Sequence, residues 1–142
     1  MAGMLLIILP WMQVTLLGVE VGYDAFDMVF GDAFNGGLFD NFDHVGRLCP
    51  MLIGLMFLIS TVSFARKSGT GAVAGGILTV LFAIYLIACI NPESYLQLAS
   101  RTAGISCWLA IIFSIAVILL GIVLRSKKKA RIAEMRAQKE ER

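Results

Sequence analysis

The residues best suited to chemistry lie in one acidic segment, and the chemistry they suit is metal binding. Carboxylate and amide oxygens are the ligands that Ca²⁺ prefers. The segment supplies them from Asp24, Asp27, Asp32, Asn35, Asp40 and Asp43. Their spacing does not follow the calcium-loop pattern of alternating Asp or Asn, a Gly and a distant Glu. We therefore predict no metal site and expect these acids to face solvent.

Three cysteines offer a second kind of chemistry, a disulfide. Cys49 begins an apolar run, Cys89 ends the next one and Cys107 begins the last. A bond between Cys89 and Cys107 would join two neighbouring helices if their ends face an oxidising compartment. The alternative, which we favour, is three free thiols that pack as small apolar side chains. No CxxC or Cys/His spacing indicates zinc or haem, so we predict no cofactor.

The apolar parts of the chain carry no catalytic motif, and we predict no enzyme. The runs 1–19, 48–65, 69–90 and 102–124 contain no Asp, Glu, Lys, Arg or His, the residues that mark transport paths inside membranes. Gln13 is the most polar side chain within them. Its amide has two donors and an acceptor that its own helix cannot satisfy. Gln13 is therefore the candidate for a buried or pore-lining position that faces another helix or water.

Four strongly apolar runs are the elements that must position these residues. Hydrophobic residues make up 58% of the chain, compared with roughly 45–50% in soluble domains. Because a helix rises about 1.5 Å per residue, roughly 20 apolar residues cross a bilayer core about 30 Å thick. We predict an all-α integral membrane protein, a bundle of four transmembrane helices in a single domain of residues 1–142. The predicted spans are 2–21, 48–65, 70–90 and 102–124, with connectors 22–47, 66–69 and 91–101 and a tail 125–142.

The distribution of charge predicts how the spans are oriented. The connector 22–47 is acidic, whereas the tail carries eight Lys or Arg and three Glu. Lys and Arg next to spans are kept on the cytoplasmic side. We therefore expect a multi-pass protein of the plasma or inner membrane with its tail and the Arg66-Lys67 turn in the cytoplasm. Four crossings would place the N-terminus in the cytoplasm as well.

The acidic connector, residues 22–47, combines acids with aromatic residues in a decayed eight-residue repeat. Each unit opens with Asp and has Phe two residues later. At about 100° per residue, the first aromatic residues fall within one sector of a helix, and Asp24 and Asp32 fall outside it. We predict an amphipathic helix whose aromatic face contacts lipid or a partner. The residues of this face are Tyr23, Phe26, Phe30, Phe34, Phe39 and Phe42.

Small residues mark the faces on which the last two spans should pack. Pairs of small residues four apart let two helix backbones approach closely inside a membrane. The third span carries two such pairs, and the fourth span carries a matching stripe. The predicted contact residues are Gly71, Ala72, Gly75, Gly76, Ala110, Ser114 and Gly121. These contacts could form within one chain or between two copies of it.

The tail is rich in helix-forming residues and should continue the last span into the cytoplasm. Its basic residues near the membrane are expected to bind anionic lipid headgroups at about 1 kcal/mol each. They are Arg125, Lys127, Lys128, Lys129 and Arg131. We predict no binding to nucleic acid, since neither aromatic residues nor a fold would position the tail on it.

These features favour a small non-enzymatic membrane protein that acts as an accessory, assembly or regulatory subunit through helix contacts. Its partners would be the bilayer and either another membrane protein or further copies of itself. The alternative is a homo-oligomeric channel or pore-forming, holin-like protein. Such a pore would have to be lined by Gln13, by other uncharged side chains or by backbone.

Overall fold

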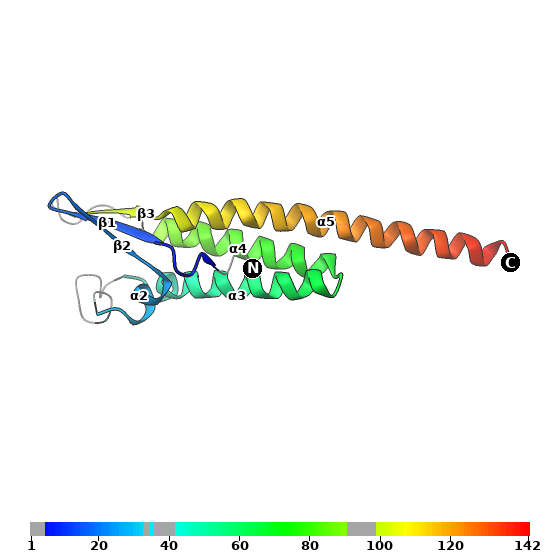
Figure 1. The fold of residues 1–142 in the computed structure, drawn as a ribbon, viewed down its shortest axis with the longest axis horizontal. Helices are drawn as coiled ribbons and strands as arrows, with labels where there is room; N and C mark the ends of the chain where they lie inside the picture. The colour runs from blue at the N-terminus through cyan, green and yellow to red at the C-terminus, as the bar shows by residue number, and fades with distance from the viewer. Residues whose placement is uncertain (1–4, 33–34, 36–41, 91–98) are drawn as a thin grey trace.

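In the part of the chain that the structure describes, three long apolar helices form the body of the protein (Figure 1). They are α3 (His44–Ala65), α4 (Gly69–Ile90) and α5 (Ile105–Glu140). In this computed structural model the described residues are 5–32, 35, 42–90 and 99–142. Each of the three helices is long and apolar enough to cross a membrane. The second, third and fourth predicted spans are therefore confirmed as helices, although α5 begins three residues later than expected.

α4 lies between the other two helices, which contact one another only slightly. A stripe of buried residues runs along α4 at alternating spacings of three and four. It comprises Gly69, Ala72, Gly76, Thr79, Ala83, Leu86 and Ile90. Gly69 and Gly76 of this stripe lie against α5, and the neighbouring Gly71 and Gly75 lie against α3, so both helices approach the α4 backbone closely. The helices thus form a layer centred on α4.

The first apolar run is not a transmembrane helix, and the predicted four-helix bundle is wrong at this point. Its residues form an antiparallel hairpin of β1 (Met12–Leu16) and β2 (Val19–Tyr23). The turn residues Leu17 and Gly18 have φ of 50° and 83°, as a two-residue hairpin turn with both angles positive requires. Apolar and polar residues alternate along both strands, and this period of two suits a half-buried sheet.

A third strand completes the sheet from the far end of the chain. β3 (Ala99–Ala103) pairs antiparallel with β1, so the strand order is β2-β1-β3. Thr102 and Ala103, predicted as the start of the last span, belong to this strand. The sheet covers one end of the helices, and the C-terminal end of α5 lies at the other (Figure 1). The prediction that both termini lie on the cytoplasmic side depended on four spans, and the first of these, residues 2–21, is not a transmembrane helix.

The acidic connector forms a helix that is shorter than predicted. α2 (Ala25–Phe30) starts at a capping box in which Asp24 Oδ1 accepts hydrogen bonds from the backbone N–H groups of Phe26 and Asp27 at 2.8 and 2.9 Å. Asp27 Oδ2 in turn accepts from the backbone N–H of Asp24. Satisfying these end groups stabilises a helix of a single turn and a half. Together, the three strands and α2 are called the cap below.

Buried side chains from all parts of the fold meet where the cap joins the helices. This core includes Trp11, Met12, Met28, Cys49, Ile53, Leu86, Ile90 and Cys107. α5 continues well past the other two helices at the opposite end, where its residues 125–140 are exposed (Figure 1). The predicted helical tail is thereby confirmed.

Candidate functional site

The segment that leads into the cap is irregular and lies against the helices. We call residues 5–11 the wedge. On one side, a Cβ on Gly54 of α3 would stand 2.7 Å from Ile7 Cδ1, so the Ile7 side chain packs directly on that glycine. On the other side, Ser106 of α5 donates its backbone N–H to Pro10 O at 3.3 Å. The wedge therefore bridges α3 and α5, which hardly touch each other.

Trp11 fixes the wedge to the core. Its indole Nε1–H donates a 2.8 Å hydrogen bond to Leu6 O, and its side chain is fully buried. Its carbonyl oxygen accepts from the Gly104 N–H at 2.8 Å and from Cys107 Sγ at 3.2 Å. Because both the ring and the carbonyl are engaged, the wedge is held in one position despite its lack of regular structure.

The outer side of the wedge is apolar and uncovered. Leu5, Ile8 and Leu9 are all exposed, with 68% of the Ile8 surface accessible. Gly54, which the wedge touches, is ten residues along α3, or about 15 Å from its first residue. If α3 crosses a bilayer, the wedge lies within the apolar layer and not above it.

Gln13 does not occupy a buried position among helices, because it lies on β1. The register places it opposite Gly22 of β2 and Thr102 of β3. Thr15 and its partner Glu20 share this polar face of the sheet, since alternate residues of a strand point the same way. Met12 and Val14 face the other side and are buried. The amide of Gln13 therefore belongs to the cap, where its neighbours are polar.

Arg47 anchors α2 to the start of α3. Its side chain is only 7% exposed. Nε donates to Met28 O at 3.1 Å, and one terminal nitrogen donates to Val29 O at 3.4 Å and to Asn35 Oδ1 at 2.5 Å. A guanidinium is well suited to the carbonyls at the C-terminal end of α2, which carry partial negative charge. The orientation of α2 is fixed by this contact.

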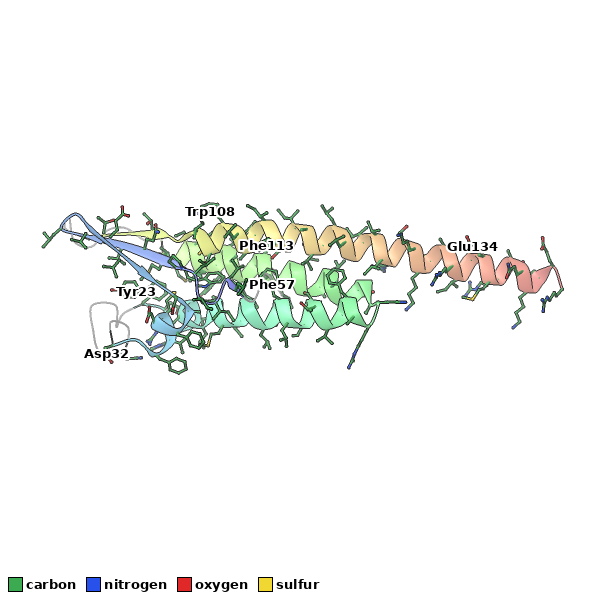
Figure 2. The ribbon with its side chains drawn as sticks, in the orientation of Figure 1. Tyr23, Asp32, Phe57, Trp108, Phe113 and Glu134 are labelled. Carbon is green, nitrogen blue, oxygen red and sulfur yellow. The ribbon has the colours of Figure 1, made fainter. Side chains whose placement is uncertain are left out.

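The predicted aromatic face of the connector is divided between the core and the surface. Phe42 is buried and Tyr23 half-buried, whereas Phe26 and Phe30 are exposed, the latter by 68%. The side of α2 that packs inward is instead formed by Ala25 and Met28. Figure 2 shows Tyr23 close to the start of α3. Phe34 and Phe39 lie outside the described residues.

The carboxylate of Asp43 caps α3 and also reaches α4. Its Oδ2 accepts a 2.7 Å hydrogen bond from the Tyr85 hydroxyl and a 3.0 Å bond from the Gly46 N–H. These hydrogen bonds, that from Tyr85 above all, lower the pKa of Asp43 below its ordinary value. The acid is therefore ionised at neutral pH and structural in its contacts.

The three cysteines are free thiols, so the Cys89–Cys107 disulfide is not formed. The physical reason is that the two sulfurs have different neighbours. Cys89 Sγ lies 4.0 Å from Asp43 Oδ2, and Cys107 Sγ donates to Trp11 O. Among the described residues, no group of three His, Cys, Asp or Glu is arranged to hold a metal ion. Asp40, one of the acids considered above, lies outside them.

The predicted packing residues meet other elements of the same chain. A side chain on Gly71 or Gly75 would collide with Ser63 or Ser60 of α3, and one on Gly76 would lie 2.6 Å from Ile118 Cγ1 of α5. On α5, a Cβ at Gly121 would stand 2.8 Å from Val73 Cγ2. Ala72, Ala110 and Ser114 are buried. The small residues of α4 thus serve two interfaces, one with each neighbouring helix.

The basic residues of the tail are solvent-exposed on α5. Arg125, Lys127, Lys128, Lys129 and Arg131 begin the part of this helix that extends past α3 and α4. Figure 2 shows the side chain of Glu134 further along the same extension.

Sequence reasoning missed the two residues that organise this end of the molecule, Trp11 and Arg47. Pro10, next to Trp11, was a signal that the predicted first helix is interrupted, because proline has no backbone N–H. A single Arg at the beginning of an apolar span was a signal for a buried partner. Comparison with known protein families, curated proteins and solved structures finds no match to this chain.

Proposed function

We propose that this protein is a non-enzymatic membrane subunit that assembles with, stabilises or regulates another membrane protein through its cap. The observation that carries the proposal is the orientation of α2. Arg47 and the Asp24 capping box hold this helix so that Phe26 and Phe30 are exposed. Large aromatic side chains on a fixed surface next to a bilayer are typical of contact sites.

The contacts among the three helices support the same proposal. Their glycines pack inside the chain, so the three spans form a complete unit that can present the cap. The proposed orientation has the cap outside the cell and the basic extension of α5 in the cytoplasm, where anionic lipid would bind it. The alternative, a homo-oligomeric channel, stays a prediction. Gln13, the residue predicted to line its pore, lies in the sheet and not in a membrane-spanning helix.

The proposal is tested on the intact particle from its native membrane. The protein is extracted into nanodiscs, and native mass spectrometry gives the mass and composition of the complex. A second polypeptide in fixed stoichiometry is expected. A particle made only of copies of this chain would contradict the subunit proposal and favour the channel.

Paired variants locate the contact. Phe26→Ala together with Phe30→Ala should lower the recovery of the second polypeptide. Ile112→Ala is the matched control, because Ile112 is comparably exposed on α5 but lies on the membrane-spanning part of that helix. Equal recovery from both variants would exclude the face of α2 as the contact.

A further inference from the structure

The exposed side of α2 combines aromatic rings with a carboxylate. Phe26 and Phe30 are both exposed, and they lie on the same side of the helix because residues four apart are neighbours on its surface. Asp27 is exposed as well and precedes Phe30 by three residues, so its side chain lies beside that ring. The uncovered side of α2 is therefore both apolar and acidic.

The carboxylate of Asp27 keeps most of its capacity to accept hydrogen bonds. Among the described residues, its side chain accepts one hydrogen bond, of 3.4 Å, from the backbone N–H of Asp24. A carboxylate has about four lone-pair sites on its two oxygens. Asp27 can therefore accept two further bonds from one planar donor without leaving the capping box.

The charge around this side of α2 is negative. Residues 12–43 contain six acids and no Lys or Arg. Asp32, just after α2, is exposed as well (Figure 2). The nearest Arg along the chain, Arg47, is buried and directs its guanidinium to Met28 O and Val29 O. A surface with this charge attracts basic groups and repels acidic ones.

From this arrangement, and resting on the proposed function, we infer that the partner contacts α2 with an arginine that stacks on Phe26 or Phe30 and pairs with Asp27. A guanidinium fits both features, because it forms two parallel hydrogen bonds with a carboxylate and stacks on aromatic faces. Its attraction to an aromatic ring increases when the contact excludes water.

The position of α2 suits a charged contact. Arg47, in the first turn of α3, bonds the end of α2 and so holds the two at the same level. Asp43 and His44 lie at this end of α3 and are exposed. The contact therefore forms at the border of the span, where charged groups remain accessible to water. Because the capping box and Arg47 hold both ends of α2, this surface is already ordered before the partner binds.

The first test is photo-crosslinking in the native membrane, followed by sequencing of the crosslinked peptides by mass spectrometry. The photoreactive residue p-benzoylphenylalanine replaces Phe30, which it resembles in shape. It is expected to yield a peptide of the second polypeptide that contains Arg.

The second test removes the charge and keeps the shape. Asp27→Asn leaves an acceptor for the Asp24 N–H but no negative charge. It should weaken the association at least about tenfold, measured by native mass spectrometry as the concentration at which half of the nanodisc particles keep the second polypeptide. Glu20→Gln is the matched control, since Glu20 is an exposed acid of the cap that lies on β2. It should leave the association unchanged.

Salt separates the charged pair from the aromatic contact. The association of the unchanged protein should weaken as the salt concentration rises from about 0.05 to 0.5 M, because salt screens exposed charges. Asp27→Asn should reduce this dependence, whereas Glu20→Gln should not.

Three results would overturn the inference. Lipid adducts alone at position 30 would mean that α2 rests on the bilayer. A crosslinked peptide from this chain would mean that a second copy covers α2. Equal effects of Asp27→Asn and Glu20→Gln, or a crosslinked peptide without Arg, would mean that no specific pair forms. In each case a second polypeptide in the native particle would leave the proposed function standing. A particle without such a polypeptide would reject the function itself.

Discussion

The hydroxyl of Tyr85 donates a 2.7 Å hydrogen bond to Asp43 Oδ2 and so joins α4 to the first turn of α3. The same oxygen accepts the N–H of Gly46 and caps α3. The carboxylate of Asp43 therefore caps the start of α3 and also holds α4 against it, close to the junction with the cap.

Replacing Tyr85 by Phe should weaken this junction in a pH-dependent way. The pKa of Asp43 is lowered in the folded protein, so its contribution to stability is present above the unfolded pKa of about 4 and is lost as the pH falls through the lower folded value. Thermal unfolding in nanodiscs should show the variant less stable at pH 7, with a smaller difference near pH 3. A difference that does not change with pH would mean that the carboxylate charge plays no part.

A larger side chain at Gly76 should disrupt the contact between α4 and α5. A Cβ at this position would lie 2.6 Å from Ile118 Cγ1 and 3.2 Å from Ser114 O. Gly76→Leu should lower the free energy of unfolding by about 1–3 kcal/mol, the usual cost of overpacking. Denaturant titration checks this value. Ala74→Leu is the control, because Ala74 is exposed on α4, and a similar loss there would mean that packing on α5 is not the cause.

Arg47→Met should release α2 from α3. The change leaves Met28 O and Val29 O without the guanidinium donors that now reach them. An unsatisfied buried acceptor costs about 1–3 kcal/mol. Hydrogen exchange of residues 24–32 should become faster, with little change in α4 and α5. Arg66→Met, at an exposed position at the opposite end of α3, should leave this exchange unchanged.

Anionic lipid should bind the start of the α5 extension. Changing Lys127, Lys128 and Lys129 to Gln should weaken this binding by about 1 kcal/mol per residue. Retention of anionic lipid on the extracted protein, measured by native mass spectrometry, reports the loss. The control removes Arg136 and Lys139, which lie more than about one Debye length further along the helix. Equal losses from both sets would mean that the tail attracts lipid only through its total charge.

The three helices were predictable because length and hydropathy decide a membrane span almost alone. The limits of α4, at Gly69 and Ile90, differ by at most one residue from the predicted span 70–90. The helical tail also followed from local composition. For these elements, information within about 20 residues is sufficient.

The hairpin was not predicted because the high overall hydropathy of the first apolar run concealed its alternation of apolar and polar residues. Gln13, Thr15 and Glu20 interrupt the apolar residues at every second position of the strands, which favours a sheet. The second partner of β1, however, is β3, more than 80 residues away. Nothing local identifies such a partner. Likewise, the Asp24 and Asp27 capping box could be found in the sequence, whereas the contact of Arg47 with the end of α2 depends on the assembled fold.

The pairing of β1 with β3 has a consequence for biosynthesis. β1 is made near the start of the chain, but its neighbour Ala99–Ala103 is made only after α3 and α4. The ribosome adds residues at roughly 5–20 per second, so the hairpin remains without its third strand for some seconds. During that interval an apolar strand edge is open to other chains. The third strand therefore closes this edge of the sheet only after the residues that follow α4 have been made.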